Sequence, residues 1–275
     1  MLTIVPLYRR KRSKYYNQYS FGSVVKLAIM QPYFFPYVGY FQLIANTDQF
    51  IFFDIVQYNK RSWMNRNRIL HPNKLDEFSY ISVPVVKHDK GLLIRDININ
   101  NDGKWQNKIL SQLDVYKKLK APFYNEVKQV VEEIFSKESG TLLDLSIQST
   151  QAICDYIGIE FNYEIASKMD LDISNIVQPG DWALEISKYK KASEYINPPG
   201  GFDIFDEKKF LENNIKLSFL KSALSVYRQS WRKNFNPGLS ILDLIMFNSP
   251  EESWQIINND FTVIDAKNVI RIQAL

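Results

Sequence analysis

The chain has 275 residues, of which 45% are hydrophobic, so it is long enough to bury a sizeable core. Its mean hydropathy of -0.26 and the lack of any run of about 18 apolar residues argue against a membrane-spanning protein, and we expect a cytoplasmic one. The net charge of +4 is too small to indicate binding of nucleic acid, and the single cysteine excludes an internal disulfide.

A basic cluster at residues 9–14 explains much of the positive charge. The short apolar stretch before it contains Pro6 and precedes the charge, whereas a signal peptide has its charge first. We therefore predict a flexible basic extension over residues 1–25, able to make weak contact with an anionic membrane surface. Residues 26–275 are expected to form a single domain.

Two apolar runs rich in β-branched and aromatic residues, 27–30 and 49–53, predict strands. Pro32 and Pro36 favour an extended loop after the first run, and a helix is expected from Gly39. A strand–loop–helix–strand unit predicts two parallel strands whose carboxyl ends lie at the ligand-binding edge of a sheet. Candidate site residues near this edge are Gln31, Tyr37, Tyr40, Asp54, Gln57 and Tyr58.

A cluster of polar and aromatic side chains follows the second strand and precedes a third predicted strand at 78–83. Its members include Tyr58, Arg61, Trp63, Asn65, Arg66, Asn67 and Arg68. A guanidinium suits carboxylate or phosphate, an asparagine both donates and accepts, and an aromatic ring stacks on a flat ring or a sugar face. The cluster favours recognition of a polar ligand; a solvated basic loop anchored by its tryptophan is the alternative.

The pattern becomes helical over a predicted insertion at about 104–156. Its first helix places Trp105, Ile109, Leu113 and Tyr116 on one stripe, which is typical of packing. The only cysteine, Cys154, lies on an apolar helical face without a nearby histidine, so we interpret it as a buried residue and not as a nucleophile. A strand is expected at 160–165.

The C-terminal half continues the alternation. We expect a helix at 181–193 with Asp181 as its N-cap, strands at 195–197 and 216–219, and a helix at 239–247 that directs Asp243 towards the site. Between them, paired glycines permit positive φ and a close approach of the backbone to a ligand, although a plain turn is the alternative. Candidate ligand contacts there are Asn197, Gly200 and Gly201. The alternation predicts an α/β fold, a mostly parallel Rossmann-like sheet with a helical annex.

Only two histidines occur, His71 and His88, and no spacing of histidines and cysteines suggests a zinc site. We therefore expect no metal ligands of that kind. A magnesium ion held by carboxylates and phosphates stays open.

Several long motifs, IMQPYFFPYVGYFQLI, RSWMNRNRI, YINPPGGFDIF and LSILDLIMFN, are similar to those of the WbqC-like proteins found with bacterial O-antigen and capsule genes. The resemblance extends from residue 26 to about residue 260. It implies an enzyme of surface-polysaccharide biosynthesis that transfers glycine or another aminoacyl or acyl group onto an amino sugar. The implied partners are a sugar nucleotide or lipid-linked sugar and an acyl or aminoacyl carrier protein, whose phosphopantetheine thioester would be the donor.

Such a transfer needs a base for the amine proton and donors for the developing oxyanion. Asp54, at the end of a buried strand, is the expected base. Asn65, Asn67 or Gln31 is expected to donate to the oxyanion. Arg61, Arg66 and Asn67 are expected to bind the anionic part of a sugar nucleotide or of the carrier's phosphopantetheine. Tyr58 and Trp63 would supply a stacking wall.

Two other functions remain open at this point. The first is that of a non-catalytic protein that binds sugar nucleotides or acts as a scaffold. Alternatively, the chain is a relative of the nucleotidylyltransferases, since Tyr37-Val38-Gly39-Tyr40 stands where that class has a His-x-Gly-His loop. Tyrosines in place of histidines would remove the adenylyl chemistry, because imidazolium stabilises the phosphoryl transition state there.

Overall fold

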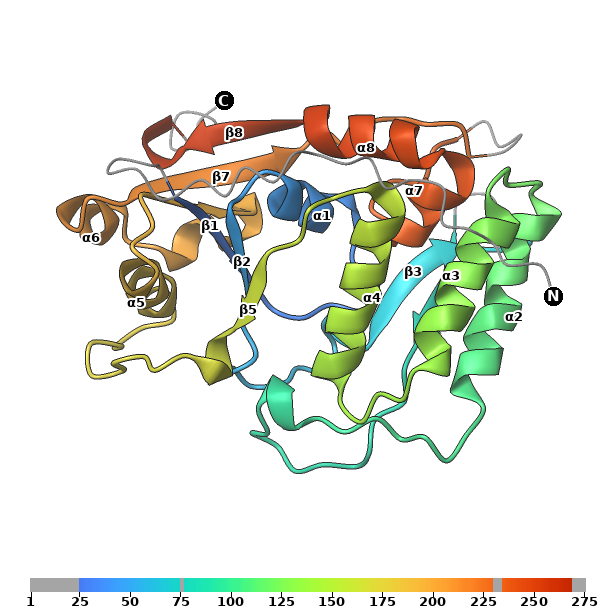
Figure 1. The fold of residues 1–275 in the computed structure, drawn as a ribbon, viewed down its shortest axis with the longest axis horizontal. Helices are drawn as coiled ribbons and strands as arrows, with labels where there is room; N and C mark the ends of the chain where they lie inside the picture. The colour runs from blue at the N-terminus through green and yellow to red at the C-terminus, as the bar shows by residue number, and fades with distance from the viewer. Residues whose placement is uncertain (1–24, 75–76, 230–233, 269–275) are drawn as a thin grey trace.

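The computed structural model describes residues 25–74, 77–229 and 234–268 (Figure 1). The basic extension predicted for residues 1–25 lies outside these residues except for Val25. At the centre is a six-stranded sheet in the order β5 (Tyr163–Ile165), β2 (Gln49–Phe52), β1 (Lys26–Met30), β6 (Glu194–Asn197), β7 (Lys216–Ser222) and β8 (Phe261–Asp265). The first five strands run parallel, and β8 runs antiparallel to β7. The predicted Rossmann-like α/β fold is therefore confirmed.

Alternate residues of the central strands bury against the two faces of the sheet, as period-two alternation requires. Ala28 and Phe50 contribute to the core on one face, and Leu27 and Ile51 to the core on the other. Helices on the first face are α1 (Val38–Ala45), α4 (Leu142–Ile157), α7 (Ile241–Phe247) and α8 (Pro250–Asn259). The second face is covered by α5 (Asp181–Tyr189) and α6 (Glu207–Glu212).

The helical annex consists of α2 (Trp105–Lys118), α3 (Tyr124–Ser136) and α4, which pack in sequence. A separate antiparallel hairpin, β3 (Arg66–Leu70) and β4 (Phe78–Ser82), contacts α2 and α7. The alternative of a solvated basic loop does not hold for the whole arginine cluster, because part of it forms β3. In β3, the side chains of Asn67 and Ile69 point towards the interior, and those of Arg66 and Arg68 point outward.

Several short elements were not predicted: β8, α6, α8 and the 3-10 turns η1 (Ile94–Asp96), η2 (Ala166–Lys168) and η3 (Pro199–Ile204). The prediction of an Asp181 N-cap is wrong by one residue, because Gly180 is the N-cap and Asp181 is the first helical residue. Its carboxylate accepts from the backbone N–H groups of Val177 and Gln178 in the preceding loop. Asp181 therefore stabilises the loop that precedes α5 and does not cap the first turn of the helix.

The chain reverses its winding direction between β1 and β6. After β1 the chain passes to α1 on one face and then to β2, whereas after β6 it passes to α6 on the other face and then to β7. Loops that diverge in this way open a crevice at the carboxyl edge of the sheet, where ligands of such folds bind. The register pairs Lys26 with Glu194, which brings Gln31 opposite the start of η3.

Candidate functional site

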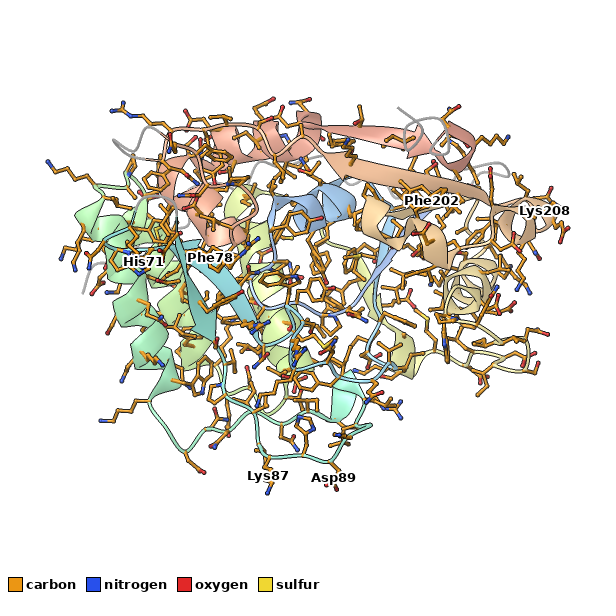
Figure 2. The ribbon with its side chains drawn as sticks, turned by 180° about the vertical axis from the view of Figure 1, so that it is seen from behind. His71, Phe78, Lys87, Asp89, Phe202 and Lys208 are labelled. Atoms are coloured by element: carbon orange, nitrogen blue, oxygen red, sulfur yellow. The ribbon has the colours of Figure 1, made fainter. Side chains whose placement is uncertain are left out.

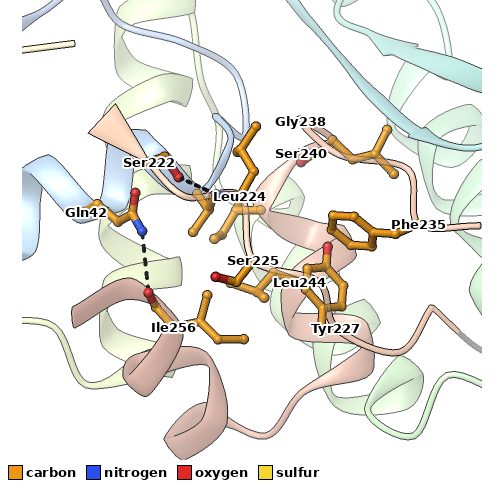
Figure 3. A pocket seen from close by; sticks show the side chains of 13 residues that line it. Gln42, Ser222, Leu224, Ser225, Tyr227, Phe235, Gly238, Ser240, Leu244 and Ile256 are labelled. Carbon is orange, nitrogen blue, oxygen red and sulfur yellow. Dashed lines mark hydrogen bonds between the residues drawn. The ribbon is translucent and has the colours of Figure 1, made fainter. Parts of the chain in front are cut away.

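A narrow cleft lies at the carboxyl end of β7, beside the first turn of α1 (Figure 3). It is walled mainly by apolar side chains. Polar side chains at its wall are Gln42, Ser222, Ser225, Tyr227 and Ser240. The cleft therefore offers neutral hydrogen-bonding groups in an apolar setting.

The orientation of Gln42 in this wall is fixed. Its amide nitrogen donates to the carbonyl oxygens of Ile256 at 3.4 Å and Asp260 at 3.0 Å, so the amide cannot be flipped without placing oxygen against oxygen. Its Oε1 is buried and receives no hydrogen bond from any described residue. Gln42 thus presents a buried acceptor with unused capacity next to the cleft.

Arg68 joins this cleft to the hairpin, because its Nη2 donates to the carbonyl of Gly238 at 2.8 Å and Gly238 lines the cleft. On the outward side of the hairpin, arginine and aromatic side chains alternate; Figure 2 shows Phe78 there. We call these residues the arginine–aromatic face: Trp63, Arg66, Arg68, Phe78 and Tyr80.

Ten buried side-chain polar atoms have no hydrogen-bond partner among the described residues, and four of them lie in the segment leading into and along β3. These four are the Tyr58 hydroxyl, Asn65 Oδ1 and the Nε atoms of Arg66 and Arg68. Burial raises the pKa of Tyr58, while the nearby charge of Arg66 opposes that rise. A group of unsatisfied polar atoms in one place is costly in the free protein and indicates a missing polar partner.

At the crevice between β1 and β6, Gln31 is the predicted residue with spare donors. The Tyr33 hydroxyl donates weakly to Gln31 Oε1 at 3.5 Å, and no described residue accepts a hydrogen bond from Gln31 Nε2. Tyr37 is the N-cap of α1, where its ring packs over Gly39. Burial raises the pKa of Tyr37, so its hydroxyl stays protonated.

The surroundings of Asp54 differ from those expected of a catalytic base. It is fully buried, and its two carboxylate oxygens accept from the backbone N–H of Ser167 at 2.9 Å and from the Ser167 hydroxyl at 2.6 Å. These contacts tie the end of β2 to η2. The role of Asp54 as a base stays a prediction, and its contacts favour a structural role.

Asn67 has a similar place in the interior. Its amide nitrogen donates to the carbonyls of Phe34 at 3.1 Å and Phe35 at 2.7 Å, and its Oδ1 accepts from the backbone of Arg68. Phe35 has a φ of 41°, an unusual value for a bulky residue. We conclude that Asn67 holds this strained loop, which leaves it no donor for an oxyanion in this conformation.

Tyr40 and Asp243 are also fully buried. The Tyr40 hydroxyl donates to the carbonyl of Gln31 at 3.0 Å. Asp243 accepts from the hydroxyls of Tyr116 and Tyr227 and from the Gln229 amide. Burial, and secondly the Asp243 charge, raise the pKa of both tyrosines, which keeps them protonated as donors.

The glycine pair after β6 does not adopt positive φ, so that reason for expecting ligand contact is wrong. A Cβ on Gly201 would lie 2.3 Å from Asn197 Nδ2, whereas one on Gly200 would meet no atom within 4 Å. Asn197 is itself bonded to the Tyr195 hydroxyl and to the Pro198 carbonyl. Gly201 is therefore needed for packing, and only Gly200 faces open space.

Of the other predicted residues, Gln57 and Arg61 are exposed, Asn65 is half-buried with its Nδ2 bonded to the Val83 carbonyl, and Tyr58 packs edge-on against His88. Sequence reasoning missed Gln42, Phe78 and Tyr80, and did not place Arg68 in the site. Arg66-x-Arg68 and Phe78-x-Tyr80 share the period of two that would have put them on one side of a hairpin.

Burial raises the pKa of the Cys154 thiol, and Cys154 packs inside the core. Within the described ranges, no three His, Cys, Asp or Glu side chains are grouped so that they could hold a metal ion. The helices of the described chain include none long and apolar enough to cross a membrane.

The family model of the WbqC-like protein family matches residues 31–254, which contain the crevice, the cleft and the hairpin. This chain belongs to the WbqC-like protein family. The WbqC-like chain is also 32% identical over 229 residues to the uncharacterized protein Rv1507c of Mycobacterium tuberculosis, a match that covers 80% of this chain and 92% of that protein. No solved structure matches it.

Proposed function

We propose that this WbqC-like protein is a transferase of bacterial surface-polysaccharide biosynthesis that attaches glycine or another aminoacyl or acyl group to an amino sugar. One observation carries the ligand-binding part of the proposal. The arginine–aromatic face meets a cleft at the carboxyl edge of a Rossmann-like sheet, where Arg68 bonds Gly238. The type of reaction rests on the family resemblance.

The reaction would join the sugar amine to the carbonyl carbon of a thioester. A C–N bond forms, the C–S bond breaks, and the leaving thiolate takes the proton that the amine loses. A protein group that donates to the carbonyl oxygen would stabilise the negative charge developing there. Gln31 is our candidate, because its Nε2 is not used by the described residues and it lies at the crevice.

The test combines binding and turnover. The full chain is incubated with nucleotide-linked 3-amino and 4-amino sugars and with glycyl and acyl thioesters of a carrier protein, and the product mass and free thiol are measured. A ligand of the native protein also raises its midpoint of thermal unfolding. We expect an acylated sugar with release of one thiol per product, and Gln31→Ala should slow its formation by about 10-fold to 1000-fold.

Binding of an amino-sugar nucleotide without turnover for any donor would instead identify a non-catalytic binding protein. Stabilisation by a nucleoside triphosphate with magnesium, without any effect of sugars or thioesters, would favour the nucleotidylyltransferase relative. Either result overturns the proposed transfer.

A further inference from the structure

The two arginines of the arginine–aromatic face have unused donors. Arg66 and Arg68 are two residues apart on β3, so their Cα atoms are about 7 Å apart and both side chains point outward. Each guanidinium makes one hydrogen bond to the described residues. Nη2 of Arg66 donates to the Arg61 carbonyl at 2.7 Å, and Nη2 of Arg68 donates to the Gly238 carbonyl at 2.8 Å. Neither pairs with a carboxylate of the described chain. Since a guanidinium carries five N–H donors, both can still bind an anion.

Aromatic rings hold both guanidinium groups in place. The Arg66 guanidinium lies 5.0 Å from the centre of the Tyr80 ring, and that of Arg68 lies 5.1 Å from Trp63 and 4.8 Å from Phe78. Such contacts restrict the side chains before any ligand arrives, which lowers the entropy lost on binding. Tyr80 is 41% exposed and Phe78 40%, and the Tyr80 ring also stacks with Trp63 at 6.4 Å between ring centres.

An independent observation also indicates a polar ligand here. Tyr58 is 6% exposed, its hydroxyl has no hydrogen-bond partner among the described residues, and the charge of Arg66 acts on it. Its hydroxyl is therefore a spare donor in the segment that leads into β3. The carboxylates tested above, Asp54 and Asp243, point elsewhere and are bonded to protein groups.

We propose that the arginine–aromatic face binds the diphosphate of a nucleoside-diphosphate sugar, with Arg66 and Arg68 on the phosphate oxygens and the nucleobase stacked on Tyr80. The inference rests on the proposed function and names the form in which its sugar substrate arrives. Two cations on neighbouring outward positions suit two linked phosphates, and a flat exposed ring suits a base. Arg68 also bonds Gly238 at the wall of the cleft, so a sugar attached to this diphosphate would lie near the cleft.

A diphosphate could also belong to a lipid-linked sugar, and the aromatic contribution separates these two sources. A nucleobase stacks on Tyr80, so Tyr80→Ala should weaken a nucleotide more than inorganic pyrophosphate, which loses only the support that the Tyr80 ring gives to Arg66. A polyprenyl diphosphate has no base to stack. A long single-stranded nucleic acid would need a longer basic track than two arginines.

The experiment is a calorimetric titration of the full chain with UDP, GDP, dTDP, inorganic pyrophosphate, a polyprenyl diphosphate in detergent micelles and a single-stranded oligonucleotide. Variants are Arg66→Ala, Arg68→Ala, Tyr80→Ala and Tyr80→Phe. The matched control is Arg95→Ala, an arginine of η1 whose side chain is 43% exposed and lies 3.7 Å from Asp96. Unfolding midpoints of all variants confirm that each is folded.

We expect at least one nucleoside diphosphate to bind. Each arginine variant should weaken it about 10-fold or more, as loss of a hydrogen bond to a charged group does. Tyr80→Ala should weaken it about fivefold or more, Tyr80→Phe and Arg95→Ala less than about twofold. Affinity of the unmodified protein should fall as salt is raised, a result that does not depend on any variant folding.

The proposal is overturned if no nucleoside diphosphate binds at millimolar concentration, if Arg66→Ala and Arg68→Ala bind it as well as Arg95→Ala does, or if the polyprenyl diphosphate or the oligonucleotide binds more tightly than any nucleoside diphosphate. Failure here is separable from failure of the transferase proposal. Acylation of a lipid-linked sugar without nucleotide binding removes only the nucleotide inference. Nucleotide binding through the arginines without acylation removes only the transfer.

Discussion

The interior of the carboxyl edge and the arginine–aromatic face both contain polar side chains, but they differ in how many of the hydrogen-bonding groups are used by the protein. In the interior, the polar groups of Asp54 and Asn67 that the sequence analysis assigned to chemistry are all bonded to protein groups. On the face, Arg66 and Arg68 each spend one donor on the described chain and leave their Nε atoms unpartnered. The comparison teaches that unused hydrogen-bond capacity, and not residue type, separates a binding group from a structural one.

The physical reason is the cost of burying polar groups. A buried donor or acceptor without a partner destabilises the protein, so groups needed only for folding end up fully bonded. A group left unbonded near the surface can be compensated by a ligand. Removal of an interior group should therefore lower stability, and removal of a face group should lower binding.

The largest expected effect is that of Asp243→Ala. The substitution leaves the hydroxyls of Tyr116 and Tyr227 and the amide of Gln229 without this acceptor in the core. We expect the free energy of unfolding to fall by about 3 kcal/mol or more, measured by urea denaturation. Asp102→Ala, at an exposed position, is the control. Equal stability of the two variants would contradict the structural role of Asp243.

Next in size is Gly201→Ala. Its Cβ would clash with Asn197 Nδ2, and Asn197 can move only by breaking its bonds to Tyr195 and Pro198. A loss of about 2 kcal/mol in the free energy of unfolding is expected, against less than about 0.5 kcal/mol for Gly200→Ala, whose Cβ meets open space. If Gly200→Ala is the more destabilising of the two, the packing account of this loop is wrong.

Asp54→Asn tests whether Asp54 is a structural group or a catalytic base. Replacing one carboxylate oxygen with an NH₂ group removes the negative charge and one of the two acceptors used by the Ser167 N–H and hydroxyl groups, so we expect a loss of about 1–3 kcal/mol in stability. Ser167→Ala, which removes one of these bonds without touching Asp54, is the matched variant. Once turnover is established, a structural Asp54 predicts similar activity for both folded variants; loss of turnover in Asp54→Asn alone would restore it as the base.

A smaller, pH-dependent effect is expected at Asp181. The bond from Lys209 at 2.6 Å, together with the backbone N–H groups of Gln178 and Val177, lowers the pKa of this carboxyl from 3.8 to about 2. A lowered pKa means that the folded protein favours the ionised form, so the stabilisation is complete above about pH 4 and lost as pH falls to about 2.

Urea denaturation of the unmodified protein and of Asp181→Asn at several pH values measures this contribution. The difference in stability should be constant from pH 5 to 7 and shrink as the pH falls below about 4. Lys209→Met should reduce the difference by removing its main cause. A difference that is the same at pH 2.5 and pH 7 would contradict the lowered pKa.

The smallest change in stability is expected on the arginine–aromatic face. Arg66→Met and Tyr80→Ala remove a half-buried and an exposed side chain of the hairpin surface. Arg66 contacts Tyr80 and the Arg61 carbonyl, and Tyr80 also contacts the rings of Trp63 and Phe78. Urea denaturation should give changes within about 1 kcal/mol. A change as large as that of Asp243→Ala would show that the face serves the fold, and the comparison between the two regions would fail.

Much of the fold follows from local patterns. The apolar run at 27–30 forms most of β1, and the run at 49–53 contains the whole of β2. The stripe of Trp105, Ile109 and Leu113 faces the core from α2, and the parallel pairing of β1 with β2 follows from the intervening helix. The run at 78–83 is a strand, but it pairs only with β3, outside the main sheet. Strand character is local, whereas the choice of partner depends on segments distant in the sequence.

The sequence by itself determined the family, the Rossmann-like alternation and the presence of an arginine-rich segment with tryptophan and tyrosine, because these depend on residue type and on short-range periodicity. The tertiary structure was needed to show which polar side chains are already hydrogen-bonded to other parts of the protein. Asp54 meets Ser167, 113 residues away, and Asn67 meets Phe34, 33 residues away. Hydrogen bonds between distant segments leave no trace in local composition, so they alone separate the bonded residues of the interior from the open residues of the arginine–aromatic face.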